Sequence, residues 1–60
     1  MRITMKAARV NAKLTQKEVA EKLGVSRATV MHWEKGITFP KSNQKMLLGQ
    51  LYNLSEADFF

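Results

Sequence analysis

The residues of this chain best suited to chemistry lie between Arg27 and Lys35. On a helix of about 3.6 residues per turn, Val30 and Trp33 share one face, which is suited to packing. The opposite face combines three basic groups with small or flexible apolar ones, from Arg27, Ala28, Met31, His32 and Lys35. In a major groove, Arg can donate two hydrogen bonds to guanine, His can bond to base edges, and Ala or Met can contact a thymine methyl. This face could therefore read DNA bases, although a solvated helix surface has a similar composition.

A helix is predicted over residues 16–23, directly before this segment. Thr15 and Glu18 have the spacing of a capping box, in which each side chain binds a backbone N–H at the start of a helix. Gly24 can adopt the positive φ that ends a helix. The apolar positions at helical spacing are Val19, Ala20 and Leu23.

A second helix is predicted over residues 27–35, with Ser26 as its N-cap and Gly36 at its end. Only three residues, 24–26, then join the two helices. A joint this short disfavours antiparallel packing and forces a steep crossing, which is typical of a helix-turn-helix.

Three further helical segments are predicted, which makes one all-α domain over residues 1–60. The first runs from Thr4 to about Ala12, and the fourth begins after the loop 37–41 with Ser42 as its cap. The fourth helix has the best apolar stripe, from Leu47, Leu48, Leu51 and Leu54. Ser55 and Asp58 resemble a weaker capping box for a terminal turn. That turn would place Phe59 or Phe60 on the core or at a dimer surface.

Composition excludes several functions and favours a polyanionic partner. The chain has no cysteine and one histidine, so a disulfide framework, a thiolate metal site and an enzyme are all disfavoured, and no cofactor is expected. It has no apolar run near the ~20 residues of a membrane span, which predicts a cytoplasmic protein without membrane attachment. All ten Lys and Arg residues lie in residues 1–45, with three acidic residues. That excess suits nucleic acid, an anionic membrane surface, or a merely solvated surface.

The segment 14–36, LTQKEVAEKLGVSRATVMHWEKG, resembles the helix-turn-helix of the phage repressor and Cro family, also called the Xre family. The resemblance spans nearly the whole chain and implies a compact five-helix, lambda-repressor-like DNA-binding domain. The matching positions are the Leu14-Thr15-Gln16 entry, Ala20, Gly24, Ser26, Val30, Trp33, Glu34 and Gly36, followed by Leu54-Ser55 and Phe59.

The resemblance also implies roles for individual residues. Base reading falls to Arg27, Ala28 and His32 with Thr29 at their flank, although His32 would equally suit a phosphate contact. The expected phosphate contacts are Thr15, Gln16 and Lys17 at the start of the second helix, and Lys35, Thr38 and Lys41 after the third. Lys17 would also fit a solvated basic surface, together with Lys13 and Lys22. Arg9 and Glu34 are expected to form a structural ion pair.

The resulting hypothesis is a transcriptional repressor that binds a palindromic duplex operator as a homodimer. Its operator cannot be taken from a relative, because Arg27 and Ala28 stand where the family often has glutamines. The alternative is an antitoxin or other protein-interaction module, with a protein partner bound through Phe59 and Phe60 and DNA binding secondary. The sequence leaves open whether the chain is a complete protein or the N-terminal part of a longer repressor.

Overall fold

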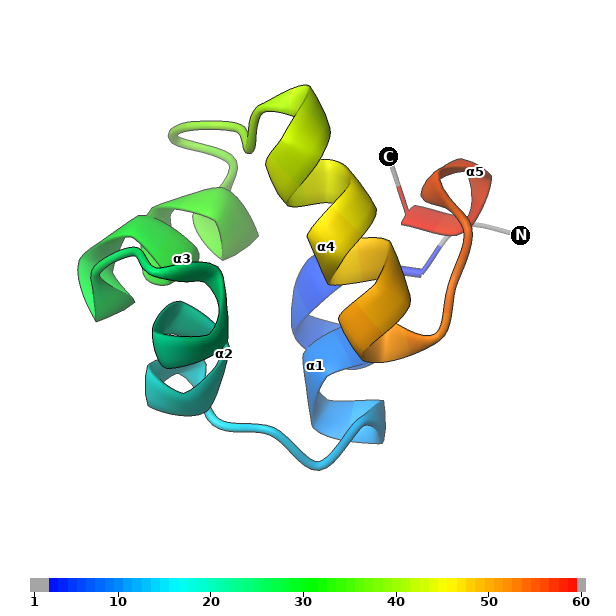
Figure 1. The fold of residues 1–60 in the computed structure, drawn as a ribbon, viewed down its shortest axis with the longest axis horizontal. Helices are drawn as coiled ribbons and strands as arrows, with labels where there is room; N and C mark the ends of the chain where they lie inside the picture. Colours follow the sequence, from blue (N-terminus) through cyan, green and yellow to red (C-terminus); the bar gives the residue numbers. More distant parts are fainter. Residues whose placement is uncertain (1–2, 60) are drawn as a thin grey trace.

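The computed structural model describes residues 3–59, with the backbone alone at positions 56 and 59 (Figure 1). Four helices of seven or more residues form the domain, and α5 is a single helical turn. Their bounds are α1 Met5–Asn11, α2 Gln16–Leu23, α3 Arg27–Lys35, α4 Ser42–Tyr52 and α5 Glu56–Phe59. In Figure 1, α2 and α3 lie on one side of the molecule and α1 and α4 on the other. The prediction of an all-α domain is confirmed.

The ends of α2 and α3 follow from local hydrogen bonds, and all four lie where the sequence predicts them. Thr15 Oγ1 accepts from the Glu18 N–H at 3.1 Å, while Glu18 Oε1 accepts from the Thr15 N–H at 2.9 Å. Ser26 caps α3 by accepting from the Thr29 N–H. Each helix then ends at a glycine in the left-handed region, with φ of 70° at Gly24 and 75° at Gly36.

The start of α4 differs from the prediction that Ser42 caps it. Lys41 is the N-cap and Ser42 is the first helical residue. The Lys41 N–H donates to Gln44 Oε1 at 2.7 Å, so the side chain three residues ahead satisfies the N–H of the cap residue, and the hydroxyl cap expected from Ser42 is not formed. Similarly, α1 begins one residue after the predicted start, because Thr4 is its cap and accepts from the Ala7 N–H.

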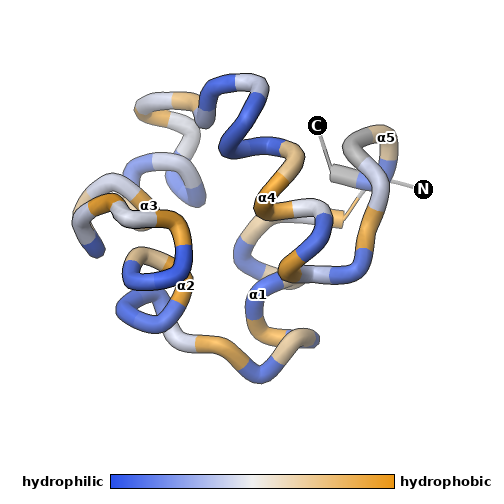
Figure 2. The backbone as a smooth tube through the Cα atoms, in the orientation of Figure 1, coloured by the Kyte–Doolittle hydropathy of each residue, from blue (hydrophilic) through white to orange (hydrophobic). Residues whose placement is uncertain are grey.

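The core lies between the pair α2 and α3 and the pair α1 and α4, where hydrophobic segments of the chain face one another (Figure 2). It consists of Ala8, Val19, Ala20, Val30, Trp33, Leu48 and Tyr52. The prediction for α4 was wrong at Leu47, which is 41% exposed, and at Leu54, which lies beyond the end of the helix. The helix is turned so that Leu48 and Tyr52, four residues apart, face inward together. Leu47 then points about 100° away from Leu48.

The first described residues lie beside α5. Ser55 donates to Asp58 Oδ2 through both its N–H and its hydroxyl, so one half of the predicted capping box is present. The Ile3 N–H donates to the Asp58 carbonyl at 2.7 Å, which ties the first described residues to α5. The predicted packing of Phe59 or Phe60 lies outside the described side chains. Within residues 3–59, every helix is too short or too polar to cross a membrane.

Candidate nucleic-acid interface

The turn between α2 and α3 is built from three residues, each with a local reason for its conformation. Gly24 takes the left-handed conformation that ends α2, and the Val25 N–H donates back to the Ala20 carbonyl at 3.0 Å. Ser26 then caps α3 from an extended backbone. The inner faces of both helices are buried, with Val19 and Ala20 from α2 and Val30 and Trp33 from α3. Packing of these faces fixes which side of α3 remains open to a ligand.

The outer side of α3 carries the residues predicted to read bases, with different degrees of exposure. Arg27 and Ala28 are exposed at the N-terminal end of the helix, and His32 is half-buried one turn further on. Thr29 is also half-buried, and its Oγ1 lies 2.9 Å from Ser26 Oγ, so its hydroxyl takes part in the helix cap. Arg27 and Ala28 are therefore the most accessible of the four.

Cationic and polar side chains from three helices surround an open hollow of about 530 Å³ at the start of α2. The lining residues are Lys6, Arg9, Thr15, Gln16, Lys17 and Arg27. Three of them, Thr15, Gln16 and Lys17, belong to the predicted phosphate contacts. Lys6 was missed because it lies on α1, nine residues before Thr15. Its only sequence signal is its basic character. The hollow opens onto the N-terminal end of α2, whose backbone N–H groups and dipole favour anions.

A largely buried polar network adjoins this hollow. Arg9 Nε is 2.7 Å from Glu34 Oε2, with side chains only 12% and 6% exposed, and Arg9 Nη1 donates to the Leu14 carbonyl at 2.9 Å. The hydrogen bond to Glu34 raises the pKa of Arg9 against the opposing effect of desolvation. The pair joins α1 to the end of α3, as the resemblance implied.

Gln16 belongs to this network, which sequence reasoning did not predict. Its Nε2 donates to Glu34 Oε1 at 3.0 Å, from the first residue of α2 to the penultimate residue of α3. One of its two amide N–H groups is thus turned inward, away from the hollow. Contact of the Gln16 side chain with a phosphate therefore stays a prediction. It would use the remaining amide N–H, with the backbone N–H beside it.

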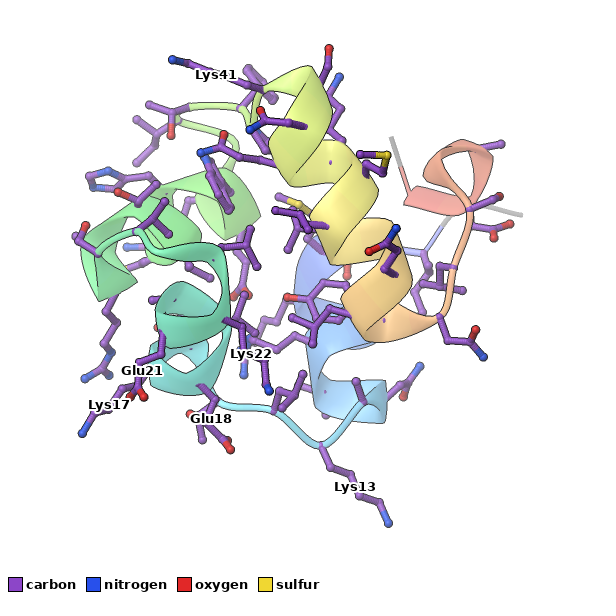
Figure 3. The ribbon with its side chains drawn as sticks, viewed as in Figure 1. Lys13, Lys17, Glu18, Glu21, Lys22 and Lys41 are labelled. Carbon is purple, nitrogen blue, oxygen red and sulfur yellow. The ribbon has the colours of Figure 1, made fainter. Side chains whose placement is uncertain are left out.

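The other end of α3 carries a second group of predicted phosphate contacts. Lys35, Thr38 and Lys41 are all exposed. The loop between them is held against α3, because the N–H of Ile37 donates to the His32 carbonyl at 3.0 Å. In Figure 3, Lys17 at the start of α2 and Lys41 before α4 lie at opposite ends of one edge of the molecule, with α3 between them.

Acidic groups are nearly absent from α3 and the segments after it, whereas Glu18 and Glu21 of α2 lie near Lys17 at one end of this edge (Figure 3). From Arg27 to Ser55, Glu34 is the only acidic residue in the sequence. Its carboxylate is buried and bonded to Arg9 and Gln16. The exposed surface of α3 and of the loop that follows is therefore positively charged, and no exposed carboxylate within residues 27–41 repels a polyanion.

Comparison with known proteins agrees with this geometry. Residues 5–59 match the family model described as helix-turn-helix, of the Cro/C1 or Xre type. The chain belongs to this family. Because the family is one of DNA-binding transcriptional regulators and not of enzymes, DNA is the partner of this helix-turn-helix domain. No curated protein and no solved structure gives a significant match to the chain.

Proposed function

We propose that this helix-turn-helix domain is the DNA-reading part of a phage-type repressor that binds a palindromic operator as a dimer, in the cytoplasm of a bacterial or phage-infected cell. The observation that carries the proposal is the outer side of α3. It presents Arg27 and Ala28 exposed, with exposed cations beyond both of its ends. A recognition helix needs this arrangement, because its side chains read base edges while the flanking cations bind phosphates on both sides of the groove.

Within this proposal, Arg27 is the strongest candidate for base reading. It is the first residue of α3 and exposed, so its guanidinium can extend beyond the helix and bond to guanine O6 and N7. Ala28 beside it suits a thymine methyl. His32 and Thr29, being half-buried, would contact the groove only along its wall. The phosphate contacts would come from Thr15, Gln16 and Lys17 on one side and from Lys35, Thr38 and Lys41 on the other.

The size of the domain is compatible with a dimer on DNA. Half-sites of a palindromic operator lie about 34 Å apart, one turn of the duplex. The domain measures 28 × 22 × 19 Å, so two copies fit side by side on one face of the duplex, each with α3 in its own major groove. Repression would follow where such an operator overlaps a promoter.

Selection of bound sites from random duplex DNA, followed by affinity measurements, tests the proposal. We expect selected sites to be palindromic with half-sites one turn apart. The logarithm of affinity should fall steeply with the logarithm of salt concentration, because bound phosphates release counterions. A slope near zero would exclude phosphate contacts and refute the proposal. Selected sites without two-fold symmetry would refute the dimer.

A charge-matched pair of variants tests the assignment of Arg27. Arg27→Ala should weaken binding to the selected site by ~1–3 kcal/mol and relax the preference at one base step. The control is Lys22→Ala, which removes an exposed cation from the side of α2 that lies beside Leu47 of α4, outside the proposed interface. This variant should leave the preference unchanged. Equal loss on all sequences with Arg27→Ala would instead make Arg27 a phosphate contact.

A further inference from the structure

The loop that follows α3 carries two highly exposed hydrophobic side chains. Phe39 is 75% exposed and Ile37 is 63% exposed, the highest values among the large hydrophobic residues of the described chain. Figure 2 shows apolar residues in this loop, away from the core. Neither side chain is buried in the fold, and in water each is available to gain free energy by burial against a ligand. Two such residues in a single short loop indicate a contact surface.

The loop is held so that these side chains stay outside. The N–H groups of Ile37 and Thr38 both point to the His32 carbonyl, at 3.0 and 3.5 Å, which fastens the loop to the last turn of α3. Pro40, directly after Phe39, is buried. Phe39 is thus fixed between an anchored proline and a hydrogen-bonded turn. A rigid loop loses little conformational entropy on binding, which makes an apolar contact here more favourable.

The charges around the loop restrict what can bind it. Lys35 precedes Ile37 by two residues, Lys41 follows Phe39 by two, and both lysines are exposed. The two apolar side chains are therefore flanked along the chain by one cation on each side. A second copy of the domain would bring the same cations against each other, and this repulsion disfavours self-association through the loop. A partner that carries apolar groups between two anionic groups is complementary to it.

The sugar–phosphate backbone of DNA has this chemistry, since apolar deoxyribose carbons lie between successive phosphates. The loop is also continuous with α3, the helix proposed to enter the groove. We infer that residues 35–41 pack along one DNA strand, with Ile37 and Phe39 against deoxyribose carbons and Lys35 and Lys41 on the adjoining phosphates. The inference rests on the proposed function and adds to it a non-ionic contact that stabilises binding without reading sequence.

Fluorescence anisotropy on the selected duplex and on a random-sequence duplex tests the inference over a range of salt concentrations. Phe39→Ala should weaken binding about tenfold on both duplexes, because a large apolar side chain no longer covers the sugars. The slope of log affinity against log salt should stay at the wild-type value, since no charge is removed. Lys41→Ala should instead reduce that slope by about one.

Two controls separate this contact from an effect on folding. Val10→Ala removes another exposed apolar side chain, 55% exposed on α1, and should not change DNA affinity. Phe39→Leu keeps an apolar side chain and should restore most of the affinity lost in Phe39→Ala. Circular dichroism should show the same thermal midpoint for every variant, and Ile37→Ser provides a second, independent loss of apolar contact.

The outcomes are distinct for the inference and for the proposed function. Failure of the wild-type domain to bind either duplex refutes the proposed function and this inference with it. Normal wild-type binding with unchanged affinity of both Phe39→Ala and Ile37→Ser overturns the inference alone. It is also overturned when these variants change only the concentration dependence of dimer formation, because the loop would then contact a second copy. A tenfold loss on the selected duplex but none on the random duplex would make the contact base-specific and would likewise overturn it.

Discussion

Replacing Glu34 by alanine should destabilise the domain severely, because the Arg9 guanidinium would remain buried without its partner. Glu34 accepts from Arg9 Nε at 2.7 Å, from Arg9 Nη2 at 3.3 Å and from Gln16 Nε2 at 3.0 Å. Removing one member of a buried ion pair costs about 3–5 kcal/mol. A cost near the lower limit of this range, ~3 kcal/mol, applies here, because the Arg9 side chain is 12% exposed and water can reach part of it.

A loss of ~3 kcal/mol is large for a chain of this size. At ~0.05–0.15 kcal/mol per residue, 60 residues correspond to a total stability of about 3–9 kcal/mol. Each kcal/mol lowers the thermal midpoint of a domain of this size by about 4–8 °C. We therefore expect Glu34→Ala to melt roughly 12–24 °C below the wild type, or to be partly unfolded at 25 °C.

Thermal and urea unfolding followed by circular dichroism measures this effect. Glu21→Ala is the matched control, because it removes an exposed carboxylate from α2 and should change stability by less than ~0.5 kcal/mol. The double variant Arg9→Met with Glu34→Leu should recover most of the loss, since an apolar pair needs no desolvation of charge. A thermal midpoint for Glu34→Ala within ~3 °C of wild type, or a double variant as unstable as Glu34→Ala, would refute this reasoning.

Three further predictions concern packing and pH. Gly49→Ala should destabilise the domain by ~1–3 kcal/mol in urea unfolding, because the added Cβ would lie 2.7 Å from the Leu54 carbonyl oxygen; an unchanged urea midpoint would contradict this. Burial raises the pKa of Tyr52 to about 12 from its ordinary 10.0, so the stability linked to this group is complete below pH 10 and is lost as the pH rises towards 12. Tyr52→Phe should therefore lose less stability than the wild type as the pH rises from 10 to 12. Equal losses of stability in both proteins would exclude Tyr52 as the source of the pH dependence. Hydrogen bonding from Thr15 lowers the pKa of Glu18 from its ordinary 4.5, so the stability linked to Glu18 is present above pH 4.5 and is lost as the pH falls below it. Glu18→Gln keeps an acceptor for the helix cap and should flatten this acid dependence, which thermal melts between pH 3 and 6 would show.

Two features of α4 could not be predicted from the sequence, and each has a physical reason. Ser42 has the residue type of a cap, yet the bond from the Lys41 N–H to Gln44 moves the helix start by one residue, and sequence patterns do not rank two such bonds. Leu47 is apolar and at helical spacing, yet it is exposed. Which flank of α4 is buried depends on its rotation against the other helices, and the pattern of leucines allowed either.

The candidate site was also predicted only in part. The exposed position of Arg27 and Ala28 follows from the helical wheel, because Val30 and Trp33 can be buried only if the opposite side is open. The family resemblance supplied the Arg9 to Glu34 pair. Neither source indicated that Gln16 also bonds to Glu34 or that Lys6 borders the same hollow, because the residues that come together there lie on three different helices.

The positions at which α2 and α3 begin and end follow from the sequence alone. Thr15 with Glu18, Gly24 and Ser26 act through hydrogen bonds or dihedral preferences within a few residues, so local order is enough to specify them. Three other features follow from the tertiary fold: which cations share one surface with α3, how Gln16 is oriented, and the outward position of the loop around Phe39. These features depend on the crossing of helices and on contacts between residues far apart in the chain, which only the packing of the whole domain fixes.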